Sequence, residues 1–139
     1  MQRLVLDTNV VASALLWDGT PRALLQAARE RRIALFTSTA LLAELTDILG
    51  RRKFERKITA SALTIDQLVD RYVALTTLVR PVLVSGVAPD PDDDVVIGTA
   101  LAAGATLIVT GDRELRSVRT HRSVRLLGVG EALATITAP

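Results

Sequence analysis

Short runs of Leu, Val and Ile alternate along the chain with longer amphipathic stretches. Five of these runs are too short for helices and predict β-strands, at residues 3–7, 33–36, 79–84, 105–111 and 124–128. They are apolar at nearly every position, which is typical of parallel strands that are buried on both faces. The third run contains Pro81, and because proline cannot donate to an interior ladder, we expect that strand at an edge of the sheet.

The stretches between these strands have apolar residues at helical spacing. They predict helices over residues 21–32, 39–49, 64–78 and 95–104. Ser38 is expected to cap the second helix and Gly104 to close the fourth. Strands that alternate with such helices predict an α/β fold, a three-layer α/β/α sandwich around a central parallel sheet. With 139 residues and no repeat or linker, the chain fits one domain spanning residues 1–139.

The composition excludes several classes of site. The chain has no cysteine and one histidine, which excludes thiolate zinc sites, disulfide scaffolds and zinc sites built from several imidazoles. Any bound metal would therefore have oxygen ligands. The apolar runs are far shorter than the ~18 residues of a membrane span, and the N-terminus predicts a strand rather than a signal peptide. We therefore expect a cytoplasmic protein that does not enter a membrane.

Charge is distributed unevenly, although the net charge is only +2. Basic side chains gather in residues 51–57 and again in residues 113–125, whereas four aspartates lie within residues 90–94. An acidic site surrounded by positive charge is what a metal-dependent enzyme acting on a polyanion needs. Either basic run can equally be a solvated helix face.

Acidic residues follow the predicted strands at the points where these strands end. Asp7 closes the first strand, Asp112 follows the fourth, and the aspartates at 90–94 follow the third after a loop. Glu44 lies in the apolar part of its predicted helix, so we expect it to point toward the sheet or its rim. Because the carboxyl ends of parallel strands share one edge, these acids are expected to meet there. Taken singly, each aspartate could be a helix cap or a turn residue.

Carboxylates this close raise one another's pKa values unless a cation neutralises them. Oxygen ligands without histidine or cysteine suit Mg²⁺ or Mn²⁺. Such an ion can generate hydroxide from water and stabilise the leaving oxygen of a phosphodiester. A nucleophilic Ser–His or Cys–His pair is not expected, because cysteine is absent and His121 lies in the arginine-rich stretch.

Three sequence motifs resemble those of the PIN domain family. They are LDTNV at residues 6–10, SxxLLAEL at 38–45 and DPDDDVVIGTALAAGATLIVTGDREL at 90–115. The resemblance spans the whole chain and is greatest to bacterial PIN proteins assigned as toxins of type II toxin–antitoxin pairs. It implies a PIN-like sandwich with strand order 3-2-1-4-5. It also implies a Mg²⁺- or Mn²⁺-dependent endoribonuclease, in which metal-activated water attacks an RNA phosphodiester.

Matched position by position, the resemblance implies a site of four acids. The catalytic and metal-binding residues it implies are Asp7, Glu44, Asp94 and Asp112. The aspartate run is longer than the chemistry needs, so Asp93 could share or replace the role of Asp94.

Polar and basic residues complete the implied site. Asn9 and Thr110 match polar positions that support the acids, and Ser38 matches a helix-start hydroxyl. Nucleic-acid contacts are expected from four basic residues, Arg113, Arg51, Arg52 and Lys53. Trp17 is a packing anchor or a base-stacking platform, and the turn that follows it favours packing.

The partners implied by the resemblance are an RNA substrate, a small antitoxin protein and a second copy of the chain in a homodimer. The alternative is a catalytically silent PIN-fold module that binds nucleic acid or a protein. Four mutually repelling carboxylates favour the enzyme, since a silent module has no need of them.

Overall fold

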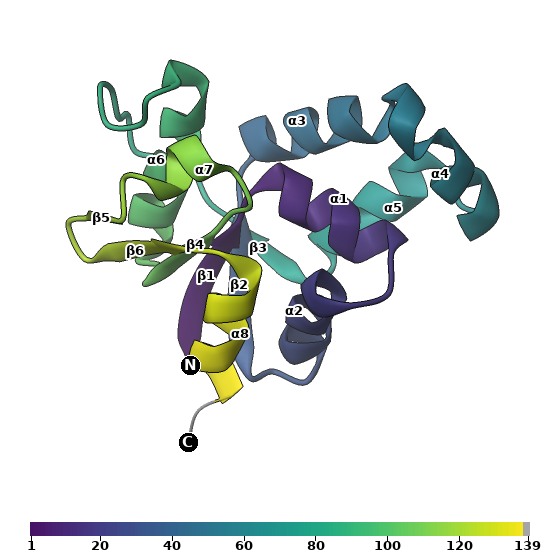
Figure 1. The fold of residues 1–139 in the computed structure, drawn as a ribbon, viewed down its shortest axis with the longest axis horizontal. Helices are drawn as coiled ribbons and strands as arrows, with labels where there is room; N and C mark the ends of the chain where they lie inside the picture. The colour runs from purple at the N-terminus through teal and green to yellow at the C-terminus, as the bar shows by residue number, and fades with distance from the viewer. Residues whose placement is uncertain (138–139) are drawn as a thin grey trace.

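A six-stranded sheet runs through the part of the chain that the structure describes, residues 1–137 of a computed structural model (Figure 1). Its strands are β1 (Gln2–Leu6), β2 (Ile33–Thr37), β3 (Thr76–Leu78), β4 (Leu107–Val109), β5 (Thr120–His121) and β6 (Val124–Leu127). They lie in the order β3-β2-β1-β4-β6-β5. Neighbouring strands pair in parallel except β5 and β6, which are antiparallel.

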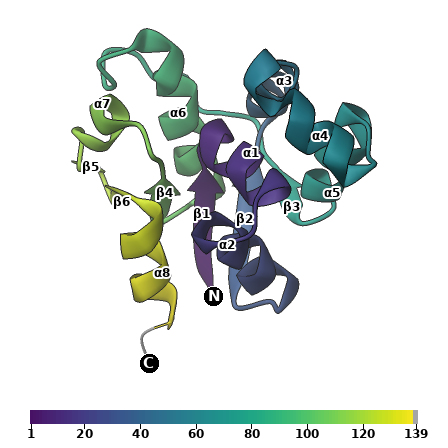
Figure 2. The ribbon, with the colours of Figure 1, turned by 45° about the vertical axis from the view of Figure 1, so that its right-hand side comes forward.

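Helices cover both faces of this sheet (Figure 2). They are α1 (Thr8–Leu16), α2 (Thr20–Arg29), α3 (Thr39–Leu49), α4 (Glu55–Ser61), α5 (Ile65–Val73), α6 (Asp94–Ala103), α7 (Arg113–Arg116) and α8 (Val129–Thr137), with two 3₁₀ turns, η1 (Arg52–Phe54) and η2 (Pro91–Asp93). Side chains of α1, α2, α5 and α8 belong to one apolar core, whereas those of α6 and α7 belong to the other. The predicted α/β sandwich is confirmed.

The alternation of side chains along β1 explains why residues 4–6 of this strand are all apolar. Leu4 and Leu6 enter the core beneath α1 and α2, while Val5 enters the core beneath α6. All three are almost completely buried. A central strand with helices on both faces has no polar side, so its sequence reads as a continuous apolar run.

The predicted strand order is confirmed for the parallel part of the sheet. Counted along the chain, the parallel strands β3-β2-β1-β4-β6 follow the order 3-2-1-4-5. The short antiparallel β5 at the edge was not predicted. It is two residues long and carries a Thr and the single His, so it has no apolar pattern to reveal it.

The third strand lies earlier in the chain than predicted. The expected helix over 64–78 ends at Val73, and Thr76–Leu78 pair with β2 where a strand was expected only from residue 79. Two adjacent threonines favour extended backbone, whereas Pro81 has no N–H for the ladder. The pairing therefore ends after the Val79 amide, which donates to the Thr37 carbonyl oxygen at 2.9 Å.

Helices α1, α4, α7 and α8 were not predicted. Helix α1 has the sequence TNVVASALL, and six of its nine residues are buried because other elements surround it. A helix buried on most sides lacks the polar face on which amphipathic periodicity depends. No helix in residues 1–137 has both the length and the apolar character needed to span a bilayer.

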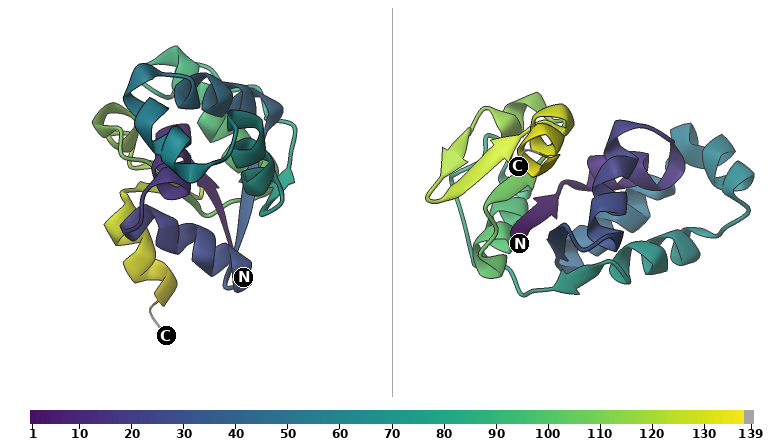
Figure 3. Two further views of the ribbon diagram at one scale, coloured as in Figure 1. Left: turned by 90° about the vertical axis from the view of Figure 1, so that its right-hand side faces the viewer. Right: turned by 90° about the horizontal axis from the view of Figure 1, so that it is seen from below.

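The carboxyl edge of the sheet collects the elements that carry the acidic residues. Strands β1 and β4 are neighbours, with Leu6 opposite Val109, so both end at this edge. Helix α3, turn η2 with the start of α6, and α7 lie around it, while the start of β1 and the end of α8 lie at the opposite end of the molecule (Figures 1 and 3).

Gly98 allows α6 to pack closely against the segment that follows β3. The Val82 amide donates to the Gly98 carbonyl oxygen at 3.0 Å, and a Cβ atom at position 98 would collide with the Val82 carbonyl oxygen. Two backbones therefore meet here without an intervening side chain.

We expect Gly98→Ala to lower the free energy of unfolding by about 1–3 kcal/mol, because the added methyl group overpacks this contact. Gly130→Ala is the matched control, because Gly130 lies in α8 with open space at its Cβ position. Helix propensity makes that change neutral or slightly stabilising. Urea unfolding of the two variants tests this difference, and equal stabilities would contradict it.

Candidate functional site

Asp7 is a buried carboxylate at the carboxyl end of β1. It also caps α1, and its backbone amide donates to the Val109 carbonyl oxygen of β4 at 2.9 Å. Its side chain is 4% exposed, yet both carboxylate oxygens accept hydrogen bonds. The Thr8 amide donates to one oxygen at 2.8 Å, and the Thr110 hydroxyl donates to the other at 2.7 Å. These bonds compensate for burial of the charged group.

The Thr110 hydroxyl links two of the predicted acids. Besides donating to Asp7, it accepts from the Asp112 amide at 3.0 Å. Asp112 in turn caps α7, where its side chain accepts from the Glu114 amide at 2.9 Å and remains exposed. Thr110 thus fixes the turn that brings Asp112 next to Asp7, which is the supporting position predicted for it.

Thr8 links Asp7 to Glu44 through its backbone amide and its hydroxyl. Its amide donates to Asp7, and its hydroxyl donates to Glu44 Oε1 at 2.8 Å. Glu44 is half-buried on α3, so it lies toward the site as its position among leucines predicted. Sequence reasoning missed Thr8 as a site residue. Its place directly after Asp7 in the LDTNV motif was the available signal.

Asp93 and Asp94 have different surroundings although they are adjacent. Asp94 is 6% exposed, and its two oxygens accept from the Ala88 amide at 2.7 Å and the Gly86 amide at 3.1 Å. It therefore holds the loop that precedes η2. Asp93 ends η2 half-buried, and the charges of Asp7 and Asp112 act on its carboxyl group.

Burial and neighbouring charges shift the acid equilibria of the site. Burial, then the carboxylates of Asp7, Asp112, Asp90 and Glu44, raise the pKa of Asp93 to about 6. Four acids from different elements thus act on one carboxyl group. A carboxyl group in this position is stabilised by a proton or by a cation.

The pKa of Asp7 is also raised above its ordinary value. Burial is the main cause, the hydrogen bonds from Thr110 and Thr8 oppose it, and the charge of Asp112 adds to it. Desolvation and repulsion between carboxylates therefore both oppose ionisation at this site.

Ser38 and Thr99 form a buried polar pair that joins α3 to α6. Ser38 caps α3 by accepting from the Leu41 amide at 3.4 Å, and its hydroxyl lies 3.0 Å from that of Thr99. Both side chains are fully buried. Ser38 thus acts by positioning α3, which carries Glu44, against α6, which begins directly after Asp93. Exposed Asn9 makes no side-chain hydrogen bond within the described residues and lines a hollow on α1.

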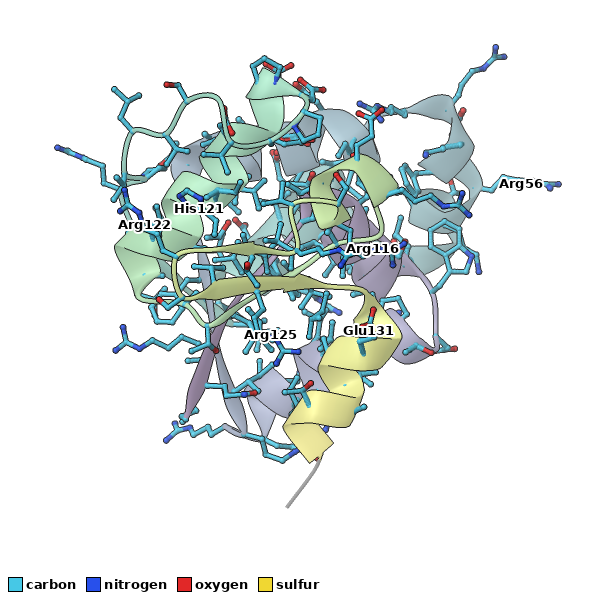
Figure 4. The ribbon with its side chains drawn as sticks, turned by 60° about the vertical axis from the view of Figure 1, so that its left-hand side comes forward. Arg56, Arg116, His121, Arg122, Arg125 and Glu131 are labelled. Carbon is cyan, nitrogen blue, oxygen red and sulfur yellow. The ribbon has the colours of Figure 1, made fainter. Side chains whose placement is uncertain are left out.

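The predicted nucleic-acid contacts are exposed but do not lie together. Arg113 follows Asp112 at the start of α7, and Lys53 lines the same hollow as Asn9. Arg51 and Arg52 lie at a separate depression between the end of α3 and α4. The later arginine-rich stretch is spread along α7 and the β5–β6 hairpin rather than gathered (Figure 4).

The donor set of the site suits a hard divalent cation. As the side chains stand, no three acidic or histidine side chains among residues 1–137 form a group compact enough to hold a metal ion. The acids nevertheless offer only oxygen donors, and four of them raise the pKa of Asp93. A cation among them would relieve this repulsion, so the residues present fit Mg²⁺ or Mn²⁺.

Comparison with known proteins identifies the family. A family model described as PIN domain matches residues 3–114. The chain belongs to the PIN domain family. A search of curated proteins gave no match to this PIN domain.

A solved structure supports the fold of this PIN domain. A chain of VapBC2 from Rickettsia felis, in a crystal structure of VapBC2 bound to a DNA fragment from their promoter, is similar with a TM-score of 0.60. The two chains are 16% identical, and the match covers 91% of this chain and 98% of that one. At this identity the similarity concerns the fold.

We expect Asp93→Asn to raise the free energy of unfolding of the metal-free protein by about 1 kcal/mol at pH 7. The pKa of Asp93 is about 6 in the folded protein against an ordinary 3.8, so the folded state binds this proton more tightly than the unfolded chain. Ionisation of Asp93 therefore lowers the free energy of unfolding as the pH rises from 3.8 to about 6. The increase in the free energy of unfolding caused by Asp93→Asn should reach its full value above about pH 6 and vanish towards pH 4. Thermal unfolding in EDTA across this range measures it.

Asp94→Asn is the matched control, because it removes the same charge one residue further on. Asn keeps one acceptor oxygen, but its NH2 group cannot accept from the second loop amide, so one of the two amide–carboxylate hydrogen bonds is lost, and we expect the change to lower the free energy of unfolding by about 1–3 kcal/mol. Stabilisation by Asp94→Asn together with destabilisation by Asp93→Asn would contradict the roles assigned to the two residues.

Proposed function

We propose that this PIN domain protein is a metal-dependent endoribonuclease. The observation that carries the proposal is the hydrogen-bonded series Glu44–Thr8–Asp7–Thr110–Asp112, which ties three acids from three elements together. The Thr8 amide donates to Asp7 and its hydroxyl to Glu44, while the Thr110 hydroxyl donates to Asp7 and accepts from the Asp112 backbone amide. The links orient the acids and leave their negative charge in place.

Asp7, Glu44, Asp93 and Asp112 are the residues we assign to hold the metal. Asp93 replaces Asp94 in this assignment, because the oxygens of Asp94 are occupied by loop amides. Asp94 remains necessary as the residue that positions the loop and the start of α6. When bound, Mg²⁺ or Mn²⁺ supplies a hydroxide from water and neutralises charge on the phosphoryl oxygens.

The remaining residues of the site bind and orient an RNA strand. Arg113 is exposed directly after Asp112, where its guanidinium can contact a phosphate beside the acids. Lys53 is exposed at the hollow that Asn9 lines, and it can bind a second phosphate. Cations placed beside the acids reduce the repulsion between a carboxylate cluster and a polyanion.

The alternative function is a silent PIN-fold module that binds nucleic acid or a protein. Such a module needs the fold but not the acids, whose burial and mutual repulsion lower the stability of the folded protein. The raised pKa values of Asp7 and Asp93 show that this cost is present here, which favours the nuclease.

We expect Asp7→Asn and Asp93→Asn each to reduce metal-dependent RNA cleavage at least about 100-fold, because each removes a charged ligand. Asp92→Asn is the matched control, since exposed Asp92 lies in the same acidic run. Labelled RNAs incubated with Mg²⁺, Mn²⁺ or EDTA provide the assay. Cleavage that survives in Asp93→Asn but is lost in Asp92→Asn would rule out the assigned site.

We also propose a small antitoxin as a partner and a homodimer as the resting form. The support is the resemblance of the motifs to toxin components, together with the similarity in fold to a chain of VapBC2. Co-expression with the small reading frames that flank the gene, followed by light scattering, should give a complex heavier than one chain. A single species of monomer mass would refute both partners.

A further inference from the structure

A hollow of about 360 Å³ runs along one face of α1, beginning near the acidic site. It is lined by Asn9 and Ser13 from α1, by Trp17, which caps the end of α1, and by Lys53 and Phe54 from η1. Asn9, Ser13 and Trp17 are four positions apart, so they follow one face of the helix. Asn9 belongs to the first turn of α1 next to Asp7, and the row from Asn9 to Trp17 extends about 12 Å. The hollow therefore leads away from the acids along the helix.

The far end of the hollow is aromatic. Trp17 and Phe54 pack edge to face, with ring centroids 5.7 Å apart and an interplanar angle of 66°. Phe54 is 5% exposed and belongs to the core, so it braces the half-buried Trp17 ring. Packing, which the sequence favoured for Trp17, is thus present, and the ring still lines the hollow. A braced ring offers a stacking surface at little entropic cost.

Two lysines place positive charge over these rings. The Lys53 ammonium lies 5.1 Å from the Phe54 ring centroid, and the Lys57 ammonium lies 5.3 Å from that of Trp17. Both lysines are exposed, and neither forms a salt bridge within the described residues. Their charge is available to an anion that approaches the rings.

We propose that this hollow binds a nucleobase of the RNA strand, with the base on Trp17 and its flanking phosphates on Lys53 and Lys57. The proposal rests on the proposed function and names a specificity subsite for it. An aromatic ring next to lysine ammonium groups is the combination that holds a single-stranded base and its backbone together. Asn9 and Ser13 offer donors and acceptors to the edge of that base. An apolar protein side chain would fill the aromatic end but would leave both cations and Asn9 without partners.

Intrinsic fluorescence tests the subsite directly, because Trp17 is the only tryptophan of the chain. Wild-type protein is titrated with a short single-stranded RNA in EDTA, and binding is followed in parallel by anisotropy of a label on the RNA. We expect saturable quenching of Trp17 emission with the same midpoint as the anisotropy. An oligomer of equal length whose nucleotides are abasic keeps the phosphates and should bind without that quenching.

Variants distinguish a contact with the base from a general effect of positive charge on RNA binding. Trp17→Leu keeps an apolar side chain for packing and should weaken RNA binding at least about fivefold by anisotropy. Lys57→Ala should weaken it as well, whereas Arg56→Ala should not, because Arg56 points away from the body of the protein (Figure 4). Circular dichroism of each variant excludes unfolding as the cause.

The outcomes distinguish the subsite from the nuclease. Unchanged Trp17 emission with bound RNA would overturn the subsite and assign the hollow to a protein partner, and cleavage of that RNA would leave the nuclease standing. Equal quenching by the abasic oligomer would also overturn it, because the contact would then involve phosphate alone. Base-dependent quenching without any metal-dependent cleavage would support the subsite and refute the nuclease.

Discussion

The buried carboxylate of Asp7 is the group on which the arrangement of the site depends. A charge with 4% exposure is tolerated only with hydrogen bonds to both oxygens, and those bonds come from the Thr8 amide and the Thr110 hydroxyl. Thr110 follows β4, so its hydroxyl reaches Asp7 because β4 pairs in parallel with β1. The Asp7 carboxylate and its hydrogen bonds therefore connect the pairing of β1 with β4, the cap of α1 and the geometry of the site.

The neighbouring acids show how a fold keeps like charges close. Both carboxylate oxygens of Asp94 accept hydrogen bonds from amides of the loop that precedes η2. That loop fixes the position of Asp93. The repulsion that raises the pKa of Asp93 is the energetic cost of this placement. Bound cations remove such a cost, so the same geometry that destabilises the metal-free protein favours metal binding.

The sequence predicts the parts of this structure that depend on local pattern. Residues 4–6 of β1 and all of β4 are apolar because helices cover both faces of these strands. The meeting of Asp7 with Asp112 follows from two parallel neighbours ending at one edge. Helix α1 escapes prediction because it is buried on most sides and lacks a polar face. The third strand was placed too late, because apolar residues at helical spacing continue as far as Leu75 and the predicted helix was extended to Leu78. The pairing of Thr76–Leu78 with β2 is a long-range contact that this local pattern does not reveal.

Long-range contacts decide the details of the site that local pattern leaves open. Thr8 links Asp7 to Glu44 only because α1 packs against α3, which the sequence does not reveal. The difference between Asp93 and Asp94 depends on a loop without periodicity, so the sequence left both residues as candidates. The assignment of the acids as metal ligands remains a prediction.

Mn²⁺ binding measured by electron paramagnetic resonance tests the central claim most directly, because it needs no RNA. Wild-type protein and Asp92→Asn are predicted to bind Mn²⁺ with equal affinity, and Asp7→Asn and Asp93→Asn at least about tenfold more weakly. Equal affinity in all four proteins, or a loss confined to Asp92→Asn, would contradict the account of an acidic metal site built around Asp7.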